Sequence, residues 1–179
     1  MSSSKEQRIV WADALRGLLI LLVVIGLSLQ FGNYENRLSW NIIYSFHMAA
    51  FFVVSGYVGY KSAYRFSSLS RKASQLLLPF VSWTFLGILI KGGGISRLVN
   101  VVLRPDNSYW FIYVLFVIIV LFITLVLIAN KYDVNPDKFL LFGVILLIII
   151  MVVAEPRLLG FQFISYYFGF YVLGYLLRK

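Results

Sequence analysis

Three groups of ionisable side chains interrupt or border the apolar stretches of this sequence. Asp13 and Arg16 begin the run "ADALRGLLILLVVIGLSLQF", three residues apart, so on a helix they share a face and can pair. His47, in "NIIYSFHMAAFFVVSGYVGY", has a ring that can take up a proton near neutral pH, as a general base does. Arg71 and Lys72, in "RKASQLLLPFVSW", are cations suited to an anionic ligand such as a phosphate.

Each of these candidates also has an ordinary structural explanation. Arg16 could extend its long side chain to lipid headgroups, while Asp13 favours the N-terminus of a helix. His47 could be a buried histidine that bonds to a neighbouring helix. Arg71 and Lys72 could serve only to anchor their helix at the membrane surface. The side-chain types alone leave both explanations open.

The elements that must position these side chains are apolar helices. Of 179 residues, 61% are hydrophobic and 13% are charged, whereas about a quarter of the residues of a soluble domain are charged. Apolar stretches recur along the whole chain and predict an all-α integral membrane protein, a polytopic bundle of about six transmembrane helices. The predicted spans are residues 9–31, 40–60, 75–90, 109–129, 139–153 and 161–177.

The distribution of Lys and Arg predicts the orientation of these spans. The side with more Lys and Arg should face the cytoplasm, which places both termini inside and requires an even number of spans. This distribution, with contact to anionic lipid headgroups, explains the net charge of +9 without a nucleic-acid partner. The richer side carries Lys5, Arg8, Lys61, Arg65, Arg71, Lys72, Lys131, Lys138, Arg178 and Lys179, and the other side Arg37, Lys91, Arg97, Arg104 and Arg157.

Composition also excludes several kinds of site. The chain has no cysteine, which excludes disulfides, thiolate catalysis and cysteine-ligated metals. With a single histidine, no zinc site is expected. Ser55, Gly56 and Gly59 form a face of small residues, which favours close packing of another helix over chemistry.

Five motifs, in order along the chain, resemble those of the membrane acyltransferase-3 family. "ADALRGLLILLVV" resembles its first-span motif, "SFHMAAFFVVSGYV" its second, and "RKASQLLLPFVSW" its basic "RxxRLLxPYxxW" segment. "YWFIYVLF" and "FGFYVLGYLLRK" resemble two later segments. Together these motifs cover essentially the whole chain, which is similar to the N-terminal part of such an enzyme. The resemblance implies that residues 1–179 form one incomplete domain, with about six of the ten or so spans that family members usually have.

The resemblance implies an activity and residue roles. Family members move acyl groups, often acetyl, from a cytoplasmic donor, acyl-CoA (acetyl-CoA), to a hydroxyl of a sugar or polysaccharide of the cell envelope, at the bacterial inner membrane. Asp13 and Arg16 match an inner-face pair associated with the acyl-donor site, and His47 matches the second-span histidine. Lys72 stands at the first arginine of the basic segment, with Arg71 beside it. No metal is implied.

Two residues depart from the family pattern. Leu27 stands where the first-span motif usually has a histidine, the expected catalytic base, and leucine cannot accept a proton. Gln75 replaces the second arginine of the basic segment. His47 and Asp13 are then the remaining candidates for a base. The alternatives to an active enzyme are a truncated, inactive relative that acts as a membrane interaction protein, and an exporter of glycans or lipids.

Overall fold

The computed structural model describes residues 10–31, 37–61, 64, 67–91, 110–154 and 158–179. Within these ranges the chain forms six α-helices and one short 3₁₀-helix, and no strand. The helices are α1 (Val10–Phe31), α2 (Arg37–Gly59), α3 (Ser67–Lys91), α5 (Trp110–Lys131), α6 (Pro136–Ala154), η1 (Leu158–Gly160) and α7 (Phe161–Arg178).

The predicted spans agree with these helices to within about three residues at each end, except at the start of α3. That helix begins at Ser67, eight residues before the predicted span. Its first two turns are rich in serine and basic residues, so hydropathy marks only the apolar part of a longer helix. The all-helical fold class is therefore confirmed, whereas a bundle of six membrane-spanning helices stays a prediction.

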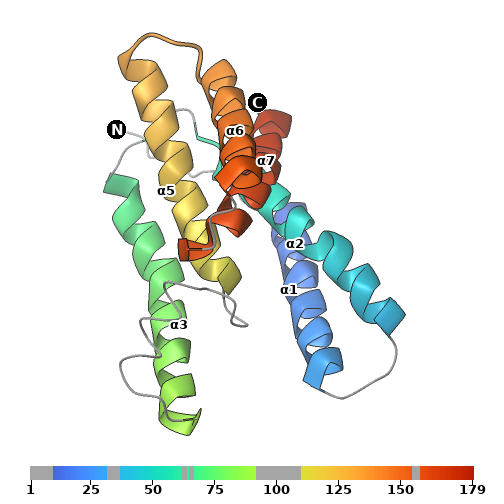
Figure 1. Cartoon of the computed structure of the whole chain (residues 1–179). Coiled ribbons are helices and arrows are strands. Elements are labelled where there is room, and N and C mark those ends of the chain that lie inside the picture. The colour runs from blue at the N-terminus through green and yellow to red at the C-terminus, as the bar shows by residue number, and fades with distance from the viewer. Residues whose placement is uncertain (1–9, 32–36, 62–63, 65–66, 92–109, 155–157) are drawn as a thin grey trace.

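Successive helices run in alternating directions, as Figure 1 shows. α7 lies at the centre and packs most extensively against α2, and also against α5 and α6. α1 packs on α2, and α3 packs on α5, so α1 and α3 lie on opposite sides of the structure. The C-terminal ends of α5 and α7 and the N-terminal end of α6 gather at one end, which we call the basic end, and α1 and α3 both begin on the side of the structure nearer to it.

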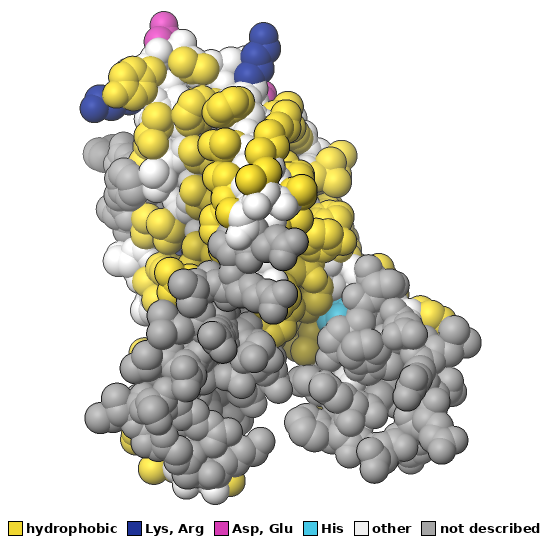
Figure 2. Space-filling view, viewed as in Figure 1, with side chains coloured by type: hydrophobic (Ala, Val, Ile, Leu, Met, Phe, Trp, Pro, Cys, Tyr) yellow, Lys and Arg dark blue, Asp and Glu magenta, His cyan; other side chains and the backbone are white. Residues whose placement is uncertain are grey.

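Among the helices that the structure describes, two are long and apolar enough to cross a membrane by length and composition. They are α5, with a mean hydropathy of 3.4, and α6, with 2.6, and α2 has a shorter apolar stretch, Phe46–Gly59. Along α6 most side chains are exposed and apolar, as expected of a helix that faces lipid. In Figure 2 hydrophobic side chains cover the helices, and Lys, Arg and Asp lie at the basic end.

Aromatic rings of α7 hold the centre of the structure together. Tyr167 stacks on Phe52 of α2 with ring centroids 4.6 Å apart. Tyr171 and Tyr175 both meet Phe122 of α5 edge-on, at 5.2 and 5.0 Å. Such aromatic pairs contribute roughly 0.5–1.5 kcal/mol beyond the burial of their area. They fix α7 between α2 and α5.

Glycines allow α2 and α7 to cross with their backbones in contact. A Cβ at Gly56 would overlap the carbonyl oxygen of Tyr171, and a Cβ at Gly174 would overlap the carbonyl oxygen of Val53. The small-residue face of α2 is thus confirmed as a packing surface. Its partner is Gly174, whose role the sequence pattern does not reveal.

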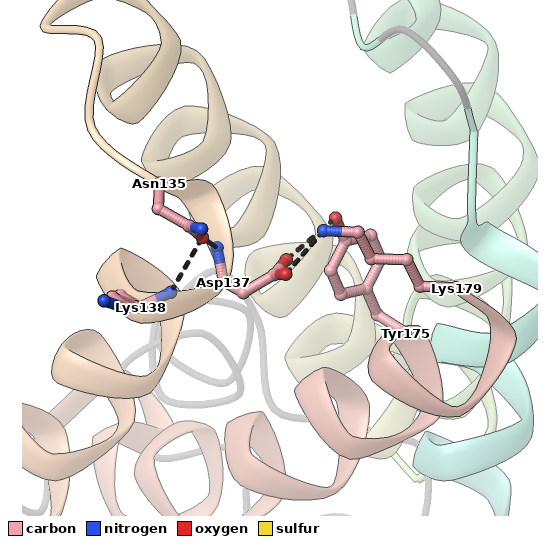
Figure 3. Close-up of polar contacts among 5 residues, drawn as sticks. All are labelled: Asn135, Asp137, Lys138, Tyr175 and Lys179. Atoms are coloured by element: carbon pink, nitrogen blue, oxygen red, sulfur yellow. Dashed lines mark hydrogen bonds and ion pairs between the residues drawn. The ribbon is translucent and has the colours of Figure 1, made fainter.

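A polar network at the basic end joins the start of α6 to the end of α7 (Figure 3). The side-chain oxygen of Asn135 accepts a hydrogen bond of 2.9 Å from the backbone N–H of Asp137, as a helix N-cap does. Pro136 occupies the first position of α6, where a backbone N–H would have no partner within the helix, so the N–H that proline lacks is not needed. The Asp137 carboxylate pairs with Lys179 and accepts a hydrogen bond of 3.4 Å from Tyr175. These contacts tie the two helices together.

Candidate functional site

Asp13 and Arg16 lie near the start of α1, and both are partly buried. The Arg16 guanidinium is close enough to the Asp13 carboxylate for their charges to attract. The Nε of Arg16 is buried and has no hydrogen-bond partner among the residues that the structure describes. Because a buried donor without an acceptor costs about 1–3 kcal/mol, the guanidinium can gain from an added acceptor.

Tyr171 of α7 contributes a buried hydroxyl beside the end of α2. Tyr171 is 2% exposed, and its hydroxyl lies within electrostatic range of Arg16 and Tyr64. It reaches the end of α2, where a Cβ at Gly59 would lie only 2.6 Å from the Tyr171 oxygen. In the sequence, Tyr171 is one of several tyrosines in an apolar motif, and nothing there indicates its neighbours.

Tyr64, in the connection between α2 and α3, lies next to this group. Its hydroxyl donates a hydrogen bond of 3.4 Å to the Gly59 carbonyl and accepts one of 3.1 Å from the Lys61 N–H. Its ring meets Phe122 edge-on at 5.4 Å. Burial raises the pKa of the Tyr64 hydroxyl above its ordinary value, so this hydroxyl stays a neutral donor. We call Asp13, Arg16, Tyr64 and Tyr171 the Arg16 cluster.

His47 lies elsewhere, in the first half of α2, and is 2% exposed. Its Nδ1 lies 2.5 Å from the carbonyl oxygen of Ile43, one turn earlier in the same helix. A carbonyl oxygen can only accept, so Nδ1 carries the proton, and in the neutral ring Nε2 is the acceptor. This bond within its own helix supports the structural explanation, in which His47 is a buried histidine whose Nδ1 is hydrogen-bonded. It also selects the tautomer that a base acting through Nε2 requires.

His47 of α2 and Leu27 of α1 lie on the same side of a small apolar cluster between the two helices. Leu22 of α1 and Ala50 of α2 pack against the same small apolar cluster, and the two helices run in opposite directions. From Ala50, His47 lies ~4.5 Å further from the basic end, and from Leu22, Leu27 lies ~7.5 Å further in the same direction. His47 and Leu27 therefore both lie beyond this cluster, on the side away from the basic end.

Arg71 and Lys72 lie on a different side of the fold. Both belong to α3, which packs on α5, whereas Arg16 belongs to α1, which packs on α2. Lys72 is partly buried and Gln75 is exposed, and the side chain of Arg71 lies outside the described residues. The described residues thus place Arg16 and Lys72 on helices that do not pack closely, although both helices begin on the side nearer to the basic end.

Comparison with known proteins gives the family. Residues 9–179 match a family described as an acyltransferase domain, which is nearly the whole chain. The chain belongs to this family. The resemblance seen in the motifs is thereby confirmed. The family is one of membrane-associated acyltransferases, so the membrane class inferred from composition is supported at that level.

Two relatives of known name cover part of the chain. It is 31% identical to the nodulation protein NolL of Mesorhizobium japonicum over 125 residues, which are 61% of this chain and 34% of that protein. It is 30% identical to NolL of Sinorhizobium fredii over 128 residues, 63% of this chain and 35% of that protein. The chain thus spans about a third of the length of these relatives. No solved structure matches the chain.

Proposed function

We propose that this protein is a multi-span membrane acyltransferase that moves an acyl group, specifically acetyl, from acyl-CoA to a hydroxyl of a cell-envelope sugar or polysaccharide. The observation that carries this proposal is the partly buried Arg16, whose buried Nε has no partner in the described part of a chain that belongs to an acyltransferase family. An anionic ligand would supply the acceptor that this guanidinium needs.

In this proposal Arg16 binds a phosphate oxygen of the acyl donor. The planar guanidinium presents several N–H groups in a fixed fork, which matches phosphate geometry better than an ammonium does. Asp13 neutralises part of its charge when no donor is bound and restricts its orientation. Arg71 and Lys72, near the start of α3, add positive charge at the same end of the bundle, where they favour the approach of an anionic donor.

His47 is the proposed base, and Asp13 is the alternative. The Nε2 of His47 takes the proton of the acceptor hydroxyl, and the hydroxyl oxygen attacks the thioester carbonyl carbon. The carbon–sulfur bond then breaks, and coenzyme A leaves as the thiol after its sulfur takes the proton from His47. Such a base contributes about 10²–10⁴-fold to a rate. The depth of His47 requires the sugar hydroxyl to enter well away from the basic end.

The membrane arrangement in this proposal has six spans, with the basic end in the cytoplasm and both termini on that side. The supporting observation is that the described lysines of the expected cytoplasmic side lie near helix ends that gather at one end of the bundle. In this arrangement Arg16 lies on the side of the membrane from which a cytoplasmic donor arrives.

A specific observation favours a second candidate function, that of a non-catalytic family member. Leu27 stands where the family motif has its histidine, and His47 is hydrogen-bonded to its own helix. A chain without a working base could retain donor binding and lose transfer. The two candidates therefore differ in turnover and not in affinity for coenzyme A.

The test measures coenzyme A binding and transfer of labelled acetyl to cell-envelope polysaccharide, both in membranes that contain the full chain. Arg16→Ala should weaken coenzyme A binding at least about tenfold, as expected for loss of a hydrogen bond between charged groups. Arg178→Ala is the matched control, because it removes a positive charge that packs on the Tyr57 ring near the same end. His47→Ala should abolish transfer and leave binding intact.

Three outcomes decide between the candidates. Transfer that His47→Ala abolishes supports the enzyme with His47 as base. Binding without transfer, with transfer gained on Leu27→His, supports the non-catalytic family member. If the parent chain binds no coenzyme A, or if Arg16→Ala and Arg178→Ala weaken binding equally, the donor site at Arg16 is wrong.

A further inference from the structure

Three side chains from three helices stack on one another near the basic end. The guanidinium carbon of Arg178, in the last turn of α7, lies 5.0 Å from the centroid of the Tyr57 ring, in the last turn of α2. The Trp11 ring, at the second position of α1, meets the same Tyr57 ring edge-on, with centroids 5.0 Å apart. We call Trp11, Tyr57 and Arg178 the Arg178 stack. All three residues belong to terminal turns, so the stack lies at the level where these helices begin or end.

The stack holds Arg178 in place and leaves its charge available to an anion. A guanidinium that packs on an aromatic ring still presents N–H groups at its edge, where they match the oxygens of a phosphate. Among the residues that the structure describes, Arg178 has no carboxylate partner, whereas the neighbouring Lys179 pairs with Asp137. Trp11 is 52% exposed, and its indole N–H is a further donor in the same stack.

An apolar strip leads from the stack toward the other end of the bundle. Phe46 and Tyr57 are eleven positions apart, about three turns, so they lie on nearly the same face of α2, ~16 Å apart along its axis. Phe46 is 46% exposed, and Ala50, between them on this face, is partly buried. On α1, Leu18 lies about two turns after Trp11 and is also exposed. Cationic and indole donors beside exposed apolar side chains are typical of the interface between headgroups and acyl chains.

The Arg178 stack lies on a different face of α2 from the Arg16 cluster. Tyr57 and Gly59 are two positions apart, so the directions in which side chains leave the helix differ by about 200° between them. The Tyr171 hydroxyl of the Arg16 cluster lies at Gly59, whereas Trp11 and Arg178 lie at Tyr57. A ligand at Arg178 would therefore be separate from an acyl donor at Arg16.

We propose that the Arg178 stack binds the phosphate headgroup of an anionic phospholipid in the leaflet at the basic end, with Arg178 and Trp11 as donors and an acyl chain along the strip to Phe46. The exposed apolar strip favours a lipid over a soluble phosphate, and the unpaired charge of Arg178 favours an anionic lipid over a zwitterionic one. The inference depends on the membrane class of the protein and does not depend on the acyl donor.

The test measures the Tm of the full chain, purified in detergent, as short-chain phosphatidylglycerol is added. At about ten times its Kd, this lipid should raise the Tm by about 3–6 °C. Phosphatidylcholine of the same chain length lacks the net negative charge, and inorganic phosphate lacks the acyl chains. Each should raise the Tm by less than about 1 °C at the same concentration.

Two variants test the donors of the stack. Arg178→Gln removes the charge and should raise the Kd for phosphatidylglycerol at least about tenfold, as expected for loss of a hydrogen bond between charged groups. Trp11→Phe keeps an aromatic ring against Tyr57 and removes the indole N–H, so it should raise the Kd about threefold to tenfold.

Lys131 provides a matched control at the same end. Its ammonium lies 5.8 Å from the centroid of the Tyr132 ring, so it is also a cation beside a tyrosine, but outside the stack. Lys131→Gln removes the same charge and should leave the Kd for phosphatidylglycerol within about twofold of the parent.

The inference is overturned if Arg178→Gln and Lys131→Gln raise the Kd equally, because binding would then reflect only the general positive charge of the basic end. It is also overturned if phosphatidylcholine or inorganic phosphate raises the Tm as much as phosphatidylglycerol does. Displacement of the lipid by coenzyme A would contradict a separate lipid site. A parent chain that binds phosphatidylglycerol through Arg178 and binds no coenzyme A would support this inference and refute the donor site at Arg16.

Discussion

Replacement of Gly174 by alanine should separate α2 from α7 and strongly destabilise the fold. The added Cβ would overlap the carbonyl oxygen of Val53 and lie 2.9 Å from the backbone nitrogen of Tyr57. Both obstacles are backbone atoms of a helix, so no side-chain rotation relieves the overlap. A carbon and an oxygen pack at about 3.3–3.6 Å, so the two helices must move apart by more than ~1 Å.

The size of the effect follows from what this movement disrupts. Overpacking of a well-packed site costs about 1–3 kcal/mol and occasionally more. Separation of the helices also weakens the Phe52–Tyr167 stack and the contact of Tyr171 with Gly56. We therefore expect a loss of about 3 kcal/mol or more, which lowers the Tm of a chain of this size by roughly 6–12 °C.

The assay is thermal unfolding of the purified full chain in detergent, with other helix glycines as internal controls. Gly17→Ala and Gly87→Ala introduce a Cβ with no atom within 4 Å, so they should leave the Tm unchanged or raise it slightly. Gly143→Ala should fall between, because its neighbour at 3.1 Å is the end of the flexible Leu125 side chain. A Tm for Gly174→Ala as high as that for Gly17→Ala would refute a backbone contact between α2 and α7.

Two further predictions concern the basic end. The hydrogen bond from Lys179 to Asp137 raises the pKa of the Lys179 ammonium above the ordinary lysine value of about 10.4. The pair should therefore stabilise the fold at and below neutral pH. This stabilisation should be lost as the pH rises through the raised pKa of Lys179. Asp137→Asn should lower the Tm slightly at neutral pH and abolish this alkaline decrease, and an alkaline decrease as large as in the parent would contradict the assignment. Reporter fusions should place Lys179 in the cytoplasm and Gly93 on the opposite side, and a periplasmic signal at Lys179 would overturn the topology.

Much of the helical architecture could be predicted from sequence because it depends on local hydropathy. In an apolar solvent a chain must satisfy its backbone hydrogen bonds internally, so a long apolar run such as residues 110–131 has little choice but to form a helix. The proximity of Asp13 to Arg16 is local in the same way, since their spacing of three residues on one helix determines it. The order of the family motifs likewise depends on sequence alone and gave the family correctly.

The environment of Arg16 could not be predicted, because it depends on which helices cross. Tyr171 is 155 positions from Arg16 in the chain, and its backbone meets α2 only because Gly56 and Gly174 let α2 and α7 touch. Nothing local distinguishes Tyr171 from Tyr175, although the Tyr171 hydroxyl lies against Gly59 and the Tyr175 hydroxyl bonds to Asp137. Similarly, sequence suggested a shared donor site for Arg16 and Lys72, whereas the fold puts them on helices that pack on different partners. Helix formation is set by neighbours in sequence, but the meeting of side chains is set by the close contacts that only the packed structure defines.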